Sequence, residues 1–165
     1  MREGYYGDCI NKYRPALVGN FLLVPGEERG GSMVDAEEIY IDAWHKEFYS
    51  HYLNKCGCRD SYHKALVYCL GIDGNTRKHI HDIYNFATGC INTECLNGSW
   101  QTDGSRKVTR LAFNLYTDRA VSVYDYDSQS DRLGECRRYS VADIMCCEYV
   151  RYFLEAVKIR YSDYL

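Results

Sequence analysis

Residues Ser99 to Arg119 read SWQTDGSRKVTRLAFNLYTDR, and they contain the clearest helix start in the chain. Ser105 is the expected N-cap, because its hydroxyl can accept a hydrogen bond from a backbone N–H that has no partner inside the helix. Gly104 marks the turn before it. Apolar residues then recur at helical spacing, at Val108, Leu111, Ala112 and Leu115. The stretch therefore predicts a helix from Ser105 to about Thr117 with one apolar face.

Three cations stand in the first turns of this predicted helix, at Arg106, Lys107 and Arg110. Positive charge there opposes the helix dipole and costs roughly 0.3–1 kcal/mol for each exposed cation. One hypothesis is an anion or nucleic-acid site, formed by the three cations with Ser105 and with Trp100 stacked on a base. The other, which we favour, is that acidic side chains of the same chain neutralise the cations and that Trp100 belongs to the core.

The chain has 165 residues and a net charge of −3, which fits one domain with a hydrophobic core. This acidic balance argues against nucleic-acid binding through overall charge and leaves only a local basic patch for it. No apolar run reaches the length of a membrane span, and the N-terminus lacks the apolar region of a signal peptide. We therefore expect a cytoplasmic protein that does not bind membranes.

Nine cysteines and seventeen tyrosines are the two biases of the composition. In a reducing cytoplasm the cysteines are expected to be free thiols, several of them buried as small apolar side chains. Tyrosine joins a large ring to a polar hydroxyl, so it suits half-buried positions and interfaces. This bias favours a surface that meets another protein, without identifying that protein.

The fold is predicted to be mostly α, with about six helices in a single domain over residues 35–165. The expected helices run from Asp35 to about Lys55, from Asp60 to Gly71, from Gly74 to about Phe86, from Ser105 to about Thr117, from Ser140 to about Cys147, and from there, after a break, to about Tyr161. Residues 1–34 contain both prolines and lack helical periodicity, which indicates a small β-hairpin or an irregular N-terminal extension.

Several details of this helical domain follow from spacing. In the first helix, a stripe of Ile41, Trp44, Phe48 and Tyr52 is expected to face the core. In the last, the inward stripe is expected to be Cys146, Val150, Phe153, Leu154, Val157 and Tyr161. Arg151 and Glu155 are expected to pair on its solvent side. Residues 89–103 show no period and predict the main loop, residues 121–124 a short strand or extended chain, and residues 125–134 a polar loop.

Catalytic and metal motifs are missing. The cysteine spacings Cys56-x-Cys58 and Cys90-x4-Cys95 do not form the paired knuckles of a zinc finger or ribbon, so a site of these four thiols is conceivable but not expected. The sequence has no phosphate-binding loop, dinucleotide fingerprint or nucleophile signature. We therefore expect no catalytic residue, metal or cofactor.

Two blocks carry a family resemblance: Ser99–Leu115, and Tyr139–Tyr161 with the sequence YSVADIMCCEYVRYFLEAVKIRY. They resemble an uncharacterised bacterial family, a domain of unknown function found in gut anaerobes and their mobile or conjugative elements. The similarity runs from about His45 to the C-terminus. Because the family has no assigned activity, the resemblance implies no site residue. It implies an accessory protein of a mobile element.

These observations lead to three hypotheses for function. The first is a non-enzymatic binding protein whose partner is a host protein or nucleoprotein, such as a nuclease or defence complex. It would then be a counter-defence factor of the anti-CRISPR kind. The second is a nucleic-acid or phosphate-binding protein that uses Trp100, Ser105, Arg106, Lys107 and Arg110. The third is a thiol- or metal-dependent enzyme.

Overall fold

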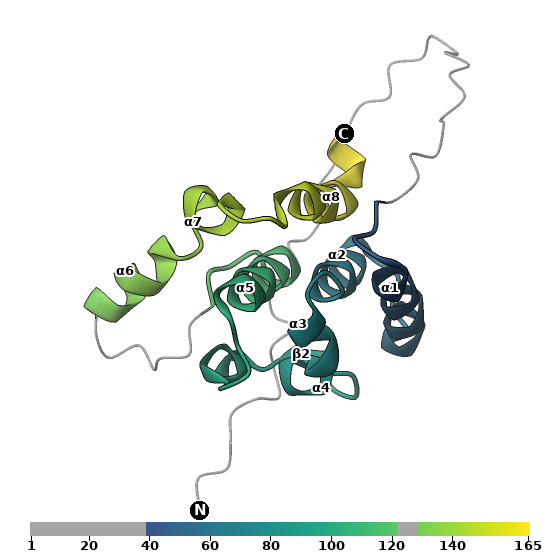
Figure 1. Cartoon of the computed structure of the whole chain (residues 1–165), viewed down its shortest axis with the longest axis horizontal. Coiled ribbons are helices and arrows are strands. Elements are labelled where there is room, and N and C mark those ends of the chain that lie inside the picture. Colours follow the sequence, from purple (N-terminus) through teal and green to yellow (C-terminus); the bar gives the residue numbers. More distant parts are fainter. Residues whose placement is uncertain (1–38, 122–128) are drawn as a thin grey trace, which may run out of the picture. The chain divides into compact units, whose positions relative to one another are not determined.

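The computed structural model describes residues 39–121 and 129–165, drawn in colour in Figure 1. These residues form eight α-helices, two short strands and two 3-10 helices, which confirms the mostly α fold. No helix among them is both long and apolar enough to cross a membrane. The extension predicted for residues 1–34, and nearly all of the extended segment predicted at 121–124, lie outside the described residues.

The elements follow one another with short connections. In chain order they are α1 (Ala43–Cys56), α2 (Ser61–Leu70), α3 (Gly74–Lys78), α4 (Ile80–Ile83), β1 (Tyr84–Asn85), β2 (Cys90–Ile91), η1 (Thr93–Asn97), α5 (Asp103–Thr117), α6 (Gln129–Arg137), α7 (Val141–Met145), α8 (Val150–Arg160) and η2 (Ser162–Tyr164).

The core forms around α2, which contacts α1, α5 and α8 (Figure 1). Asp60 caps its N-terminus, as predicted, by accepting a hydrogen bond from the His63 backbone N–H at 2.9 Å. Every residue from Ala65 to Leu70 is buried, so the second half of α2 has no solvent side. The Cys69 thiol donates to the Val108 carbonyl of α5 at 3.4 Å. The two central helices are thus packed closely enough for a side chain of one to bond to the backbone of the other.

The helix α1 differs from the prediction in both its start and its inward face. It begins at Ala43, because the Asp42 carboxylate caps it by accepting from the His45 backbone N–H. Its buried residues are His45, Phe48 and Tyr49, whereas Trp44 is 72% exposed. The predicted core stripe is therefore correct for Phe48, which is buried, and for Ile41 and Tyr52, which pack against the core, but wrong for Trp44. The stripe does not include His45, because histidine is rarely counted among apolar residues.

The helix α5 starts two residues before the predicted position. Thr102 is the N-cap, and Ser105 stands three residues later, where each side chain hydrogen bonds to the backbone N–H of the other. Ser105 is thus the second half of a capping box and not the N-cap. Gly104 lies inside the first turn of α5 and not in the turn before it.

The third predicted helix is broken in two. α3 ends at Lys78, α4 runs from Ile80 to Ile83, and the chain then enters a two-stranded antiparallel hairpin of β1 and β2. Tyr84 is paired with Ile91 in this hairpin. Residues 89–103, predicted as one long loop, therefore contain β2 and η1.

The C-terminal region is confirmed in outline and corrected in detail. Ser140 caps α7, and a break separates α7 from α8, as predicted. Residues 129–134, assigned to a polar loop, belong instead to α6. Glu155 is buried and pairs with Lys158 at 3.2 Å, so the predicted solvent-side pair with Arg151 is wrong.

The predicted inward stripe of α8 is correct only in part. Phe153 is fully buried, as expected, but Leu154 and Val150 are exposed. Ala156 and Arg160 are buried in their place. Arg160 donates to the Leu115 carbonyl at 2.9 Å and pairs with Asp118 at 3.0 Å, which ties the end of α8 to the end of α5.

Candidate functional site

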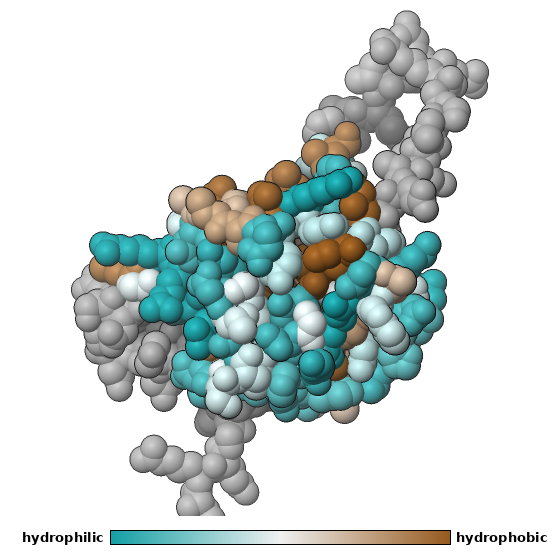
Figure 2. All heavy atoms as spheres, in the orientation of Figure 1, coloured by the Kyte–Doolittle hydropathy of each residue, from teal (hydrophilic) through white to brown (hydrophobic). Residues whose placement is uncertain are grey.

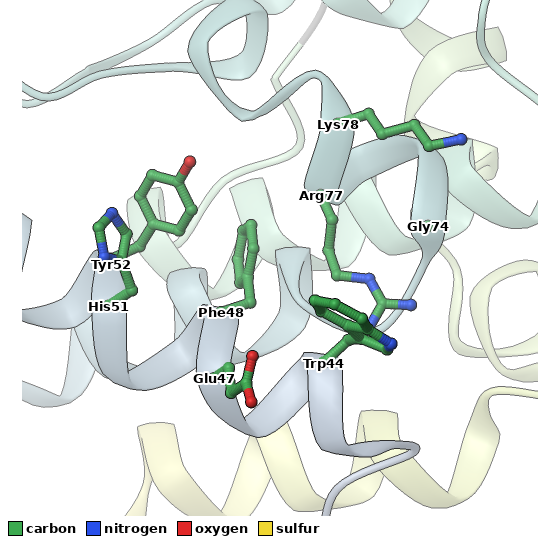
Figure 3. A pocket seen from close by; sticks show the side chains of 8 residues that line it. All are labelled: Trp44, Glu47, Phe48, His51, Tyr52, Gly74, Arg77 and Lys78. Carbon is green, nitrogen blue, oxygen red and sulfur yellow. The ribbon is translucent and has the colours of Figure 1, made fainter.

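An open groove of about 570 Å³ lies between α1 and α3 (Figure 3). Its lining comes from one face of α1 and from the short α3, and consists of Trp44, Glu47, Phe48, His51, Tyr52, Gly74, Arg77 and Lys78. The α1 residues recur at positions i, i+3, i+4, i+7 and i+8, which is the spacing of one side of a helix. Three residues of the stripe predicted to face the core, Trp44, Phe48 and Tyr52, also line this groove.

An ion pair joins the two walls at one end of the groove. Arg77 of α3 donates to both oxygens of Asp42, the N-cap of α1, at 2.7 and 3.0 Å. A two-bond contact of this kind fixes orientation as well as distance. The Arg77 guanidinium, through this hydrogen bond above all, holds the pKa of the Asp42 carboxyl below its ordinary value. This contact therefore ties α3 to the N-terminus of α1 at one end of the groove.

Four side chains of the groove are exposed: Trp44, Glu47, His51 and Lys78. Trp44 is 72% exposed, an unusual position for so large an apolar side chain. Lys78 is also exposed, and no described carboxylate pairs with it. Phe48, which is almost buried, forms the apolar inner part. The surface thus combines an exposed aromatic ring with charged groups of both signs, Lys78 and Glu47.

A buried histidine, His45, lies behind Phe48 on the inner side of the groove. The His45 Nε2 atom donates to the Tyr68 carbonyl at 2.8 Å, and Nδ1 accepts from the Ile41 backbone N–H at 3.3 Å. Both ring nitrogens are used by a neutral imidazole, and burial lowers the pKa of His45 to about 4. A Cβ on Gly71 would lie 2.5 Å from the His45 ring and 3.0 Å from Phe48. Gly71 is thus required here for space.

The basic start of α5 is arranged differently. Arg110 is buried and pairs with the equally buried Glu135 of α6 at 3.1 Å. Lys107 pairs with Asp103 at 3.2 Å and donates to the Cys146 carbonyl at 3.0 Å. Two of the three cations therefore have partners within the chain, which is the arrangement that we favoured from the sequence.

The other predicted site residues at this helix start face different neighbours. The ring of Trp100 stacks on His79 with centroids 4.4 Å apart and planes 2° from parallel. Ser105 is buried and donates to the Gln101 side chain at 2.6 Å. Arg106 donates to the Leu96 carbonyl at 3.4 Å. None of the five predicted residues lines the groove between α1 and α3.

A second surface feature is apolar. Figure 2 shows hydrophobic residues gathered over α7 and α8, along the upper edge of that view. The exposed apolar side chains of this region are Val141 of α7, at 76%, with Val150 and Leu154 of α8. We call these three residues the apolar ridge. Exposed apolar residues close to one another are typical of surfaces that contact another protein.

The thiols do not gather as a four-cysteine site. All eight described cysteines are free, and Cys95 is buried whereas Cys58 is exposed. Among the described residues, a different set brings possible ligand atoms within 4.8 Å of one another: Cys58, Asp60 and His63. Sequence reasoning missed this set because it looked for paired cysteines. The signal was a cysteine two residues before a helix N-cap, with a histidine in the first turn.

The model of a protein family of unknown function, DUF6075, matches residues 36–165. No curated protein and no solved structure matches the chain.

Proposed function

The chain belongs to the DUF6075 family of unknown function, and we propose that it is a non-enzymatic binding protein whose partner is another protein. The groove between α1 and α3 carries this proposal. It offers a tryptophan that is 72% exposed beside a nearly buried phenylalanine. Tryptophan, tyrosine and arginine are the residues that most often supply binding energy at protein interfaces.

The chemistry of the groove defines the kind of segment that fits it. An apolar side chain of the partner would pack between Trp44 and Phe48, where it is removed from water. A carboxylate beside it would face Lys78, whose charge has no described acidic partner. The partner is therefore a protein segment with an apolar residue next to an acidic one. The apolar ridge on α7 and α8 is a second exposed surface that a partner could cover.

The identity of the partner is proposed from the resemblance described above. An accessory protein of a mobile element acts on the proteins of its bacterial host, so the partner would be a host protein or nucleoprotein, such as a nuclease of a defence complex. This step is an association and not a consequence of the groove.

A capture experiment tests the proposal. The full chain is immobilised and exposed to a lysate of a bacterial host that carries the mobile element. Captured proteins are identified by mass spectrometry. Trp44→Ala and Lys78→Glu are run in parallel, with Leu154→Ser as a variant of the apolar ridge and Arg119→Ala as a control on an exposed loop. We expect a stoichiometric partner that Trp44→Ala loses.

The outcomes separate the parts of the proposal. A partner lost with Leu154→Ser but kept with Trp44→Ala would move the binding surface to the apolar ridge. A partner that contains no host defence protein would remove the counter-defence role and leave protein binding. Failure to capture any stable partner would contradict the proposal as a whole.

The nucleic-acid alternative is less well supported by the geometry. The buried pair of Arg110 with Glu135 and the contacts of Lys107 leave Arg106 as the only one of the three cations without an acidic partner among the described residues. A single cation gives a weak dependence of binding on salt. A steep salt dependence whose slope falls by about one in Arg106→Ala would revive this alternative.

A further inference from the structure

A second group of polar side chains lies at the connection between α1 and α2, on residues that the groove does not use. Cys58 and Asp60 are exposed, and His63 is half-buried in the first turn of α2. Their sulfur, oxygen and nitrogen atoms lie within 4.8 Å of one another. A thiol, a carboxylate and an imidazole together are the ligand types that zinc takes in proteins.

The orientation of the His63 ring is set by a contact on the side that faces away from Asp60. Its Nε2 atom lies 3.3 Å from the Tyr116 hydroxyl, and Tyr116 donates to the Gly89 carbonyl at 2.8 Å. A tyrosine hydroxyl has one proton to donate. Because this proton is given to Gly89, the contact between Tyr116 and His63 favours a proton on Nε2.

This assignment leaves the Nδ1 atom of neutral His63 with a lone pair. Nδ1 lies 2.9 Å from both oxygens of the Asp60 carboxylate, which also only accept. Two acceptors at this distance repel each other unless a proton or a metal cation lies between them. An imidazole held by a hydrogen bond at one nitrogen, with the other nitrogen facing ligand atoms, is the usual arrangement of a metal-binding histidine.

The backbone of this connection is fixed before any ion binds. Gly57 ends α1 in the left-handed conformation, at φ 67°, which few other residues adopt without strain. Asp60 is held by its capping bond to the His63 backbone. Arg59 is turned back to Asn54 of α1, with a hydrogen bond of 2.5 Å, so it does not neutralise Asp60 by an ion pair.

We propose that Cys58, Asp60 and His63 form a zinc site, with the thiolate, one carboxylate oxygen and Nδ1 as ligands. The fourth position of a tetrahedral ion would be open, because two of the three residues are exposed. The second oxygen of Asp60 keeps its role as the cap of α2. Tyr116 holds the histidine ring from behind. The thiol favours zinc over magnesium and calcium, which prefer ligands that are all oxygen.

Metal titration of the reduced, untagged full chain tests this site. Cobalt(II) is added first, because a cobalt–thiolate bond produces a charge-transfer absorption band, and zinc is then used to displace it. Isothermal titration calorimetry with zinc chloride gives the stoichiometry and the affinity. The variants are Cys58→Ser and His63→Gln, with Cys146→Ser and His81→Gln as controls at an exposed cysteine and an exposed histidine elsewhere.

We expect a single zinc ion per chain, a thiolate band with cobalt, and affinity about tenfold weaker or worse in Cys58→Ser. Both controls should bind as the wild type does. Cys58 is exposed, so Cys58→Ser keeps the fold even if His63→Gln does not. Absence of saturable binding by the wild type would overturn the proposal, as would equal binding by Cys58→Ser. Loss of binding in Cys146→Ser would place the ion elsewhere.

Discussion

The start of α5 and the groove between α1 and α3 both bring aromatic rings and cations together, but the two regions expose these side chains to different degrees. At the start of α5, Arg110 is buried against Glu135, and Trp100 is stacked on His79. In the groove, Trp44 is exposed and Lys78 has no described acidic partner. The residue types are alike, and the neighbours differ.

This difference separates structural charge from charge that is available for binding. A cation whose partner is buried with it holds two helices together, and removing either member leaves an unpaired charge inside the protein. A cation on an open surface contributes little to stability and can meet a partner. We therefore regard the start of α5 as part of the framework and the groove as the contact surface.

The largest expected effect concerns the framework. Arg110→Met leaves the Glu135 carboxylate buried with only a distant contact to Arg138, at 3.9 Å. We expect a loss of about 3–5 kcal/mol in the free energy of unfolding, measured by urea denaturation. The double variant Arg110→Met/Glu135→Leu should recover most of this loss, because no charge remains buried. An Arg110→Met protein as stable as the wild type would show that the pair has no structural role.

The second effect concerns the histidine behind the groove. The pKa of His45 is about 4 in the folded protein, below its ordinary value of 6.5. The unfolded chain therefore takes up a proton between these pH values that the folded protein does not. The contribution of His45 to the free energy of unfolding is fully present above pH 6.5 and falls by up to about 3 kcal/mol as the pH drops to 4. Urea denaturation across this range measures the fall.

A variant isolates the contribution of His45 from that of the carboxylates. His45→Gln keeps a side-chain donor for the Tyr68 carbonyl and cannot gain a proton in this pH range. The difference in unfolding free energy between wild type and His45→Gln should therefore change with pH between 6.5 and 4. A constant difference would contradict the buried neutral histidine.

The third effect compares two glycines near the groove. Gly71→Ala places a methyl group against the His45 ring and Phe48, and overpacking of this kind costs about 1–3 kcal/mol. Gly74→Ala, in the wall of the groove, meets no atom within 4 Å, and alanine suits a helix better than glycine. We expect Gly71→Ala to lower the thermal midpoint, and Gly74→Ala to leave it unchanged or raise it slightly. Equal effects would show that the inner side of the groove can adjust.

The smallest expected effect on stability is at the centre of the groove. Trp44 is mostly exposed, so Trp44→Ala should change the free energy of unfolding by less than about 0.5 kcal/mol. The same substitution should remove partner capture. A large loss of stability would mean that Trp44 belongs to the framework, and the contrast between the two regions would then disappear.

Local signals in the sequence predicted much of the helical framework. Asp60 and Ser140 were identified as N-caps because a capping side chain and a following apolar period occurred together. The break between α7 and α8 was predicted because the apolar residues on its two sides do not share one helical face. Thr102 was missed as the N-cap of α5 because Ser105, three residues later, has the same capping chemistry. Such ambiguities shift a boundary and leave the element in place.

The candidate sites needed information that the sequence does not contain. The inward face predicted for α1 was wrong at Trp44, and the groove forms between α1 and α3, whose relative placement the sequence does not give. The helix α6 was taken for a loop because its residues are mostly polar. The ligand set of Cys58, Asp60 and His63 depends on Tyr116, which is 53 residues from His63 and fixes its ring.

The thiol of Cys69 can be used as a chemical probe of motions in the core. It is fully buried between α2 and α5, and burial raises its pKa, so a thiol reagent can attack it only while the two helices are separated. Once the exposed cysteines have been blocked, the rate of Cys69 labelling measures how often the centre of the protein opens. Because Cys69 donates to the backbone of α5, this rate reports the opening of that helix pair and not the fraying of a helix end.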